Sequence, residues 1–422
     1  MTNYRPNTLV LQITNRCNAD CSFCGIEKEN QSDLSEDTIM KCIDQADEVG
    51  YSGVEFTGGE VLLRYDDVKR YASNVTSKGM KCGFITNAYI ANTREKGYKL
   101  AEELKGVHLE GICISFDADH QKYVPYENVL NTVKGALAKD LDVSLRTTHR
   151  IDTVENNINM LGKLATEVGG EFHMGNLKED DDSKITVNGK IIKVEENCIE
   201  LAGRAKNLDK DNFLPKRSIN NDKWCSCFPA DSLVKSNGNF LPCCSFYTGS
   251  NDFYVMGNVK DTDLRTLLRR TNDSAIDLVM SPYGLLRIGY VLEKSENPKI
   301  RKMKNKRYVA KCEFCSNVFS EQETRDFVVD EFNKFRGTEP TVVFKEREMA
   351  KLHNATVIAG NKEIKLTEYL GPLSIKDFFT SAYGHDLKII EENEKRGKNL
   401  ARLKKETQEG LDIFRNMKKA SY

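Results

Sequence analysis

The stretch NRCNADCSFCG, from Asn15 to Gly25, brings three cysteines into one short segment. Cys17, Cys21 and Cys24 are separated by three residues and then by two. A zinc site needs a fourth Cys or His, and none follows at the spacing of a zinc finger. Iron–sulfur clusters normally take four cysteines, so three thiols would leave one iron open for a reactant. A zinc site, a chance grouping of thiols and a cluster with an open iron all remain as interpretations.

The composition is that of a soluble globular protein with two or three domains. The 422 residues are 39% hydrophobic and 30% charged. Because 62 basic residues face 63 acidic ones, no overall field attracts nucleic acid or a membrane surface. No apolar run approaches the roughly 20 residues of a membrane helix, and residues 1–6 do not resemble a signal peptide. We expect a cytoplasmic protein without membrane or nucleic-acid partners.

The 13 cysteines do not predict a disulfide framework, because the cytosol keeps thiols reduced and the number is odd. Four isolated cysteines are interpreted as buried apolar side chains: Cys42, Cys82, Cys113 and Cys198. The clustered cysteines are interpreted as candidate metal ligands: Cys17, Cys21, Cys24, Cys225, Cys227, Cys243, Cys244, Cys312 and Cys315.

Around the three cysteines, the first 177 residues alternate short apolar runs with amphipathic helical patterns. This alternation predicts parallel strands joined by right-handed crossovers. The expected strands are Thr8–Thr14, Gly53–Thr57, Met80–Thr86, Leu109–Phe116, Leu141–Thr148 and Glu171–Leu177. The expected helices include Ser35–Val49, in which Ser35 is the predicted N-cap. Six such units are fewer than a closed barrel needs, so we predict an α/β fold with an open, partial (β/α)6 TIM-like barrel.

Polar residues follow these predicted strands. Cys17 follows the first strand, TGGE (Thr57–Glu60) the second and Asn87 the third. SFDAD (Ser115–Asp119) ends the fourth, RTTHR (Arg146–Arg150) ends the fifth, and His173 to Asn176 lie on the sixth. In α/β barrels the carboxyl ends of the strands form the active face. We therefore expect these residues to meet at one edge of the sheet.

The cysteine spacing after the first strand of a partial barrel resembles the radical S-adenosylmethionine enzymes, and EFTGGE (Glu55–Glu60) is similar to a second motif of that family. The resemblance covers the first 177 residues. It implies that Cys17, Cys21 and Cys24 are catalytic ligands of a 4Fe–4S cluster whose open iron binds S-adenosyl-L-methionine. Reductive cleavage to a 5′-deoxyadenosyl radical and hydrogen abstraction from a substrate carbon are the implied chemistry. A reductant such as flavodoxin or ferredoxin is the implied partner.

The resemblance also assigns contacts to the cofactor. Gly58 and Gly59 would let the protein backbone approach the methionyl end of the cofactor. Glu60 would bind its amino group, and Ser115 and Asp117 in the fourth-strand segment would meet its ribose. Arg146 would meet its carboxylate. Taken alone, each is also an ordinary residue of a turn or a barrel mouth.

A second group of cysteines lies in CSCFPADSLVKSNGNFLPCC (Cys225–Cys244) and CEFC (Cys312–Cys315). It resembles the SPASM/Twitch extension, and the absence of cysteines after Cys315 points to the shorter Twitch form. The resemblance implies one auxiliary 4Fe–4S cluster that relays electrons, with four ligands: Cys227, Cys243, Cys312 and Cys315. A zinc ribbon is the alternative. Cys225 and Cys244 are then substitute ligands, hydrogen-atom donors or spare buried thiols.

We predict four segments along the chain. They are the partial barrel (1–177), a hairpin insertion and linker with an Asn188–Gly189 turn (178–203), a small α+β Twitch-type iron–sulfur domain (204–318) and a largely helical extension (319–422). Because the first predicted strand begins near the first residue, we expect no leader-binding module before it.

The resemblance favours modification of a ribosomally made peptide or protein, by oxidation, cross-linking or epimerisation. Dehydrogenation or epimerisation of a small natural product, such as an aminoglycoside, is the first alternative. RNA modification is another, based on KRGKNLARLKK (Lys395–Lys405), although acidic residues flank this run. A non-catalytic scaffold with a structural metal is the last.

Overall fold

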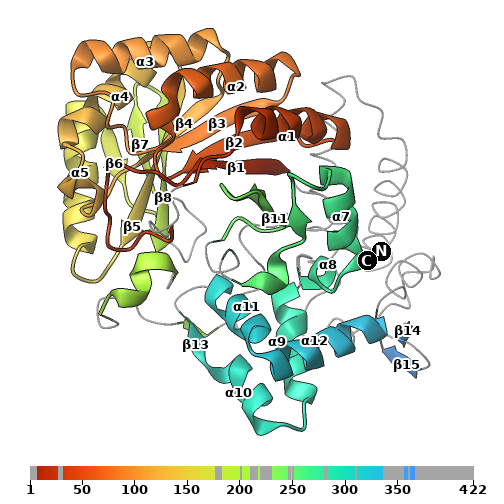
Figure 1. Ribbon diagram of the computed structural model, residues 1–422. Helices are drawn as coiled ribbons and strands as arrows, with labels where there is room; N and C mark the ends of the chain where they lie inside the picture. The colour runs from red at the N-terminus through yellow and green to blue at the C-terminus, as the bar shows by residue number, and fades with distance from the viewer. Residues whose placement is uncertain are drawn as a thin grey trace, which may run out of the picture. The chain divides into compact units, whose positions relative to one another are not determined.

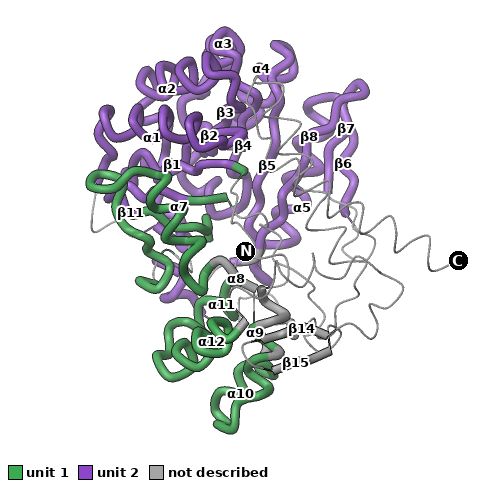
Figure 2. The backbone as a smooth tube through the Cα atoms, turned by 90° about the vertical axis from the view of Figure 1, so that its right-hand side faces the viewer, with its two compact units in different colours: residues 1–7, 217–232, 240–422 green, residues 8–216, 233–239 purple. Residues whose placement is uncertain are grey.

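The computed structural model describes residues 7–26, 32–175, 183–199, 202–209, 217–218, 231–245, 249, 251–279, 284–308, 311–335, 356–359 and 362–365. The chain divides into two compact units (Figure 2). Unit 2 comprises Thr8–Lys216 and Leu233–Asn239, and unit 1 comprises Met1–Asn7, Arg217–Ser232 and Phe240–Tyr422. The predicted ligand Cys227, its neighbour Cys225 and the basic stretch 395–405 lie outside the described residues.

Strands and helices alternate along most of unit 2 (Figure 1). The strands are β1 (Thr8–Thr14), β2 (Gly53–Gly58), β3 (Lys81–Thr86), β4 (Gly111–Ser115), β5 (Asp142–His149), β6 (Glu171–His173), β7 (Lys184–Val187), β8 (Lys190–Cys198) and β10 (Ser232–Val234). The helices are α1 (Glu36–Val49), η1 (Val61–Arg64), α2 (Tyr65–Ser77), α3 (Arg94–Gly106), η2 (His120–Lys122), α4 (Tyr126–Ala138), α5 (Val154–Glu167) and η3 (Gly203–Asn207).

Local sequence signals explain where these elements begin and end. Ser35 is the N-cap of α1, and its side chain accepts a hydrogen bond from the backbone N–H of Thr38, as the sequence predicts. The helix ends at Gly50, which has a φ of 93° and donates its N–H to the carbonyl of Ala46. The isolated cysteines Cys42 and Cys82 are 0% and 1% exposed, which confirms that they are core residues.

Six parallel strands form an open sheet in the order β1-β2-β3-β4-β5-β8, with β10 beside β1. Helices α1 to α5 lie along the outer side of this curved sheet (Figure 1). Between β4 and β5, the register sets Ser115 opposite Arg146. Because the strands are parallel, their carboxyl ends lie at a common edge. The predicted open, partial barrel is confirmed.

The sixth parallel strand is not the predicted one. Glu171–Leu177 was expected to follow the fifth strand in the sheet, but β6 (Glu171–His173) pairs antiparallel with β7 at the outer edge. The predicted Asn188–Gly189 turn does form, with φ values of 49° and 79°. Its second strand, β8, returns to pair in parallel with β5. The segment 178–203, predicted as an insertion, therefore contains the last strand of the parallel sheet.

The described part of unit 1 is mainly helical. Its helices are η6 (Asp252–Tyr254), α7 (Leu264–Asp273), α8 (Ile276–Val279), α9 (Gly284–Lys294), α10 (Pro298–Asn305), α11 (Lys311–Ser320) and α12 (Gln322–Phe335). Its short strands include the antiparallel pairs β9 (Arg217–Ser218) with β13 (Arg307–Tyr308), and β14 (Thr356–Ala359) with β15 (Lys362–Lys365). Strands β11 (Asn239–Leu241) and β12 (Gly257–Asn258) precede α7. The helix predicted near residues 387–417 lies outside the described residues.

Fully buried aromatic side chains form the core of unit 1, among them Phe240, Tyr254, Phe314, Phe319 and Phe332. In the part of the chain that the structure describes, every helix is too short or too polar to span a bilayer.

Candidate functional site

The loop that carries Cys17, Cys21 and Cys24, called the cysteine loop below, spans residues 15–25 and begins at the carboxyl end of β1. Cys21 is buried, and the other two thiols are half-buried. The backbone N–H of Ala19 donates to Cys17 Sγ at 3.4 Å. Burial raises the pKa of the Cys17 thiol, the Ala19 hydrogen bond opposes this shift, and the other two thiols add to it. Iron binding at Cys17 would therefore have to displace its thiol proton.

Side chains from neighbouring strand ends hold the cysteine loop. After β3, Asn87 Nδ2 donates to Asn18 Oδ1 at 2.9 Å. After β4, Tyr123 Oη donates to the carbonyl of Asp20 at 2.8 Å. Asn87, expected from the sequence at this edge of the sheet, thus contacts the loop directly.

Arg204 fixes the part of the loop between Cys21 and Cys24. Its Nε donates to the carbonyl of Cys21 at 2.9 Å, and its backbone N–H donates to that of Cys24 at 3.0 Å. Its Nη1 lies 3.1 Å from Asp20 Oδ1. The preceding Gly203 has a φ of 53°, and a Cβ there would lie 2.7 Å from the carbonyl oxygen of Cys24. Glycine is therefore required at this close approach.

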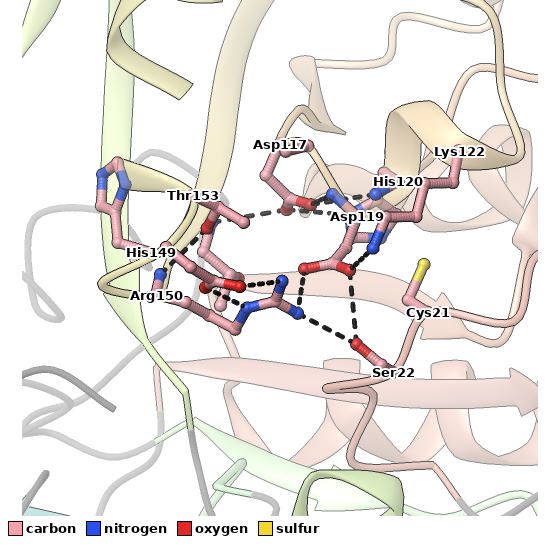
Figure 3. A network of polar contacts seen from close by, with 12 residues as sticks. Cys21, Ser22, Asp117, Asp119, His120, Lys122, His149, Arg150 and Thr153 are labelled. Carbon is pink, nitrogen blue, oxygen red and sulfur yellow. Dashed lines mark hydrogen bonds and ion pairs between the residues drawn. The ribbon is translucent and has the colours of Figure 1, made fainter. Parts of the chain in front are cut away.

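A buried ion pair lies beside the loop (Figure 3). Arg150 Nη1 lies 2.8 Å from Asp119 Oδ2, and their side chains are 9% and 2% exposed. The Ser22 hydroxyl donates to Asp119 at 3.3 Å and accepts from Arg150 at 3.1 Å. Asp119 Oδ1 also lies 2.7 Å from Lys122 Nζ, and Arg150 Nε lies 2.8 Å from Asp152 Oδ1. Because each buried charge has a partner, the network can position Ser22 without leaving an unpaired charge.

Gly58 and Gly59 pack against the backbone that leads into the cysteine loop. A Cβ on Gly58 would lie 2.1 Å from the carbonyl oxygen of Thr14, and one on Gly59 would lie 2.1 Å from that of Arg16. The N–H groups of Gly59 and Glu60 donate to these same carbonyls at 2.9 and 2.8 Å. The glycines are thus needed where two backbone segments meet. Their predicted contact with the cofactor stays a prediction.

Glu60 is 1% exposed and has three protein donors. Its Oε1 accepts from the N–H of Leu62 at 2.9 Å and from the Thr86 hydroxyl at 2.7 Å, and its Oε2 accepts from the N–H of Asn87 at 2.7 Å. Burial raises the pKa of this carboxyl, and the hydrogen bonds oppose the shift. Glu60 therefore joins the ends of β2 and β3. Its predicted bond to the amino group of the cofactor is untested.

Asp117, predicted to meet the ribose, is 1% exposed and faces His120. Asp117 Oδ2 lies 2.8 Å from His120 Nδ1, and Asp117 Oδ1 accepts from the N–H groups of Asp119 and His120 at 3.0 Å each (Figure 3). Burial disfavours a charged ring, but Asp117 and a hydrogen bond with Cys21 outweigh it and hold the pKa of His120 well above its ordinary value. Asp117 thus reaches Cys21 through His120.

Arg146, predicted to meet the carboxylate of the cofactor, pairs with Glu195 on β8. Its Nε and Nη2 lie 3.0 and 2.7 Å from Glu195 Oε2. Ser115 stands opposite Arg146 in the register and is half-buried at the end of β4. The structure gives Arg146 a protein partner, and contacts of both residues with the cofactor remain predictions.

Three of the four predicted auxiliary ligands are described in unit 1. Cys243 and Cys315 are buried and Cys312 is half-buried. Cys312 and Cys315 lie three residues apart on α11, which sets them on one side of the helix. Burial raises the pKa of Tyr254, whose hydroxyl lies 2.8 Å from Cys315 Sγ.

The two groups of thiols fit iron–sulfur clusters, whose irons are held by cysteine thiolates. Among the described residues, no three Cys, His, Asp or Glu side chains are grouped so that they could hold a single metal ion. The described cysteines are free of disulfides, and the N–H directed at Cys17 Sγ is of the kind that supports cluster sulfur.

The sequence placed Asp119 and Arg150 at the active edge but did not show that they pair with each other. Arg204 was missed, because its partner Cys21 lies 183 positions away in the chain. Glu195 was missed because β8 was taken for part of an insertion. His173, expected at the active edge, instead ends β6, with its side chain near Thr186 on β7.

Residues 11–182 match the model of the Radical SAM superfamily. YydG of Bacillus subtilis, named as a candidate peptide biosynthesis protein, is 22% identical over 242 residues, which cover 56% of this chain and 69% of YydG. A GTP 3′,8-cyclase of Clostridium botulinum is 27% identical over 157 residues, which cover 35% of this chain and 47% of the cyclase.

Solved structures give weaker likenesses. The structure of anSMEcpe with bound AdoMet and the Cp18Cys peptide covers 78% of this chain and 96% of its own, at 12% identity and a TM-score of 0.44. Streptococcus suis SuiB bound to the precursor peptide SuiA covers 61% of this chain and 63% of its own, at 16% identity and a TM-score of 0.36.

Proposed function

We propose that this chain, whose residues 11–182 match the model of the Radical SAM superfamily, is a radical SAM enzyme that modifies a ribosomally made peptide or protein. The observation that carries the proposal is the cysteine loop, held at the carboxyl edge of the parallel strands by Asn87, Tyr123, Arg150 and Arg204. The peptide substrate is supported by the similarity to YydG, whose name refers to peptide biosynthesis. The outcome would be oxidation, a cross-link or epimerisation.

Radical SAM domains use S-adenosylmethionine and a 4Fe–4S cluster. Together, when bound, they supply a carbon-centred radical that can remove hydrogen from an unactivated carbon. Cys17, Cys21 and Cys24 would hold the cluster. The polar residues at the ends of β2, β4 and β5, including Glu60 and Ser115, would line the cofactor. Buried contacts such as Asp119 with Arg150 would keep the cysteine loop in place during turnover.

Cys243, Cys312 and Cys315, with Cys227 as the fourth ligand, would hold an auxiliary 4Fe–4S cluster. A cluster with four cysteine ligands has no open iron, so electron transfer to or from the substrate is the role proposed for it. A flavodoxin or ferredoxin would supply electrons to the cluster of unit 2. Small natural products remain the alternative substrate class.

The first prediction concerns the cysteine loop. Replacing Cys17, Cys21 and Cys24 by Ala should abolish formation of 5′-deoxyadenosine with dithionite, because the cluster loses all three protein ligands. The control is Cys82→Ala, which changes a cysteine that is 1% exposed within β3 and should leave this activity in place. Cofactor cleavage by the triple variant at the rate of the parent protein would disprove the site.

The substrate class is tested by anaerobic turnover with short peptides encoded next to the gene and, in parallel, with small natural products. Mass spectrometry reads the outcome. Loss of two hydrogens indicates oxidation or a cross-link, whereas one deuterium taken up from D2O at otherwise unchanged mass indicates epimerisation. Product from small molecules and from none of the peptides would contradict the proposal.

A further inference from the structure

Tyr254 lies at the end of η6 with its hydroxyl directed at α11. The side chain is 0% exposed. Its Oη lies 2.8 Å from Cys315 Sγ and 3.4 Å from the carbonyl oxygen of Cys315. A distance of 3.4 Å is long for an O–H···O bond, whereas 2.8 Å is a close contact with the larger sulfur atom, so the hydroxyl is bonded mainly to the sulfur.

Neighbouring contacts keep the Tyr254 ring in this place. Just before η6, Asn251 Nδ2 donates to Ser320 Oγ at 3.1 Å, which fastens the segment to the end of α11. Phe253 stacks on Phe319 with ring centroids 4.4 Å apart and an interplanar angle of 4°. Tyr254 meets the same Phe319 nearly edge to face, at 5.9 Å and 82°. Tyr254 is therefore positioned by α11, the helix that carries Cys315.

The direction of the hydrogen bond follows from the chemistry of a metal ligand. A cysteine bound to iron is a thiolate and has no proton to donate. The hydrogen must therefore come from the tyrosine. A tyrosine phenol has an ordinary pKa of about 10, so its O–H persists at neutral pH.

We propose that the Tyr254 hydroxyl donates to the Cys315 thiolate and thereby raises the reduction potential of the auxiliary cluster. This inference rests on the auxiliary cluster of the proposed function. One-electron reduction adds negative charge to the cluster, and an O–H dipole aimed at a ligand sulfur stabilises the more negative state. Tyr254 is thus a positioning residue that makes the cluster a better electron acceptor from a substrate radical.

The test is a redox titration followed by electron paramagnetic resonance. The full chain carrying Cys17→Ala, Cys21→Ala and Cys24→Ala provides a background in which the auxiliary cluster alone contributes the signal. Tyr254→Phe in this background removes the O–H and keeps the ring. We expect its reduction potential to be more negative than that of the background protein.

Tyr308→Phe is the matched control. Tyr308 is also buried in unit 1, at 3% exposed, but its hydroxyl donates to the carbonyl of Met303 at 2.7 Å rather than to a thiol. Tyr308→Phe also loses a buried, hydrogen-bonded hydroxyl, so a general destabilisation of unit 1 would affect both variants. The potential of Tyr308→Phe should equal that of the background protein.

Iron and sulfide analysis separates the possible failures. A background protein without about four irons per chain would overturn the auxiliary cluster, and this inference with it. Full iron content and an unchanged potential in Tyr254→Phe would overturn the role of the tyrosine alone. If Tyr254→Phe does not assemble a cluster, 3-fluorotyrosine at position 254, a stronger donor of nearly the same size, should make the potential more positive. An unchanged potential there would also reject the inference.

Discussion

At Gly59 a single methyl group should disturb the site, since a Cβ would lie 2.1 Å from the carbonyl oxygen of Arg16. Gly59→Ala must push apart the end of β2 and the start of the cysteine loop. It should also weaken the 2.8 Å hydrogen bond from the N–H of Glu60 to Arg16. We expect a loss of about 1–3 kcal/mol in the free energy of unfolding, together with reduced iron content after reconstitution. Urea denaturation and iron analysis measure the two effects.

The matched control is Gly162→Ala. Gly162 lies within α5, and a Cβ there would meet no atom within 4 Å. Alanine should stabilise this helix by roughly 0.5–1 kcal/mol. Equal stability and equal iron content in the two alanine variants would show that the close approach of the Gly59 and Arg16 backbones does not require glycine.

Single-residue reasoning identified the chemical groups better than their partners. Glu60 and Asp117 lie at strand ends as expected, but the sequence could not show that Glu60 accepts from Thr86 or that Asp117 faces His120. Residue type and spacing indicate what a side chain can do. Its partner depends on which segments the fold brings together.

At the scale of elements, the position of β8 is the main difference between prediction and structure. Both Glu171–Leu177 and β8 contain apolar residues, so the pattern alone could not decide which of them pairs with β5. In the structure, β8 buries Ile192 and Val194, which are 1% and 2% exposed. Partly exposed β6 is the outer strand. Burial against the rest of the sheet decides the pairing.

Glu196 should stabilise this sixth strand in a way that depends on pH. Its carboxylate lies 3.0 Å from His149 Nε2 on β5 and 2.6 Å from Ser183 Oγ. The hydrogen bond from His149 is the largest cause that lowers the pKa of Glu196 below its ordinary value of 4.5. The stabilisation is therefore complete above about pH 4.5 and is lost as the pH falls through the lowered folded-state pKa.

Glu196→Gln should therefore reduce the free energy of unfolding at pH 7 by about 1 kcal/mol. The difference from the parent protein should shrink as the pH falls below about 4.5. Unfolding curves at pH 7 and pH 4 measure it. The control is Glu171→Gln, because the Glu171 side chain is 83% exposed and its carboxylate lies 4.0 Å from His173 Nε2. A difference that stays constant across this pH range would contradict the assignment.

At the scale of the whole molecule, the two cysteine sets belong to different compact units. Cys17, Cys21 and Cys24 lie in unit 2, whereas Cys243, Cys312 and Cys315 lie in unit 1. Such a division favours separate roles for the two proposed clusters, one for cofactor cleavage and one for electron transfer.

The corresponding variant is Cys312→Ala with Cys315→Ala. It should retain formation of 5′-deoxyadenosine but form no modified product, because the electron relay is lost. Its iron content should fall from about eight to about four per chain. Chromatography, mass spectrometry and iron analysis read these outcomes. Cys42→Ala, at a fully buried position in α1, should keep both activities. Unimpaired product formation by the double variant would show that the auxiliary cluster takes no part in turnover.

The amino-acid sequence by itself determined the local features of this protein. These are the thiol spacing of the cysteine loop, the cap at Ser35, the Asn188–Gly189 turn and the alternation that makes a parallel sheet. Each depends on residues close together in the chain, where conformational preferences and spacing suffice. Only the tertiary structure decided which strand follows β5, and that Arg204, 180 or more positions from Cys21 and Cys24, holds their loop. Such contacts depend on burial and pairing across the folded sheet, which no local pattern encodes.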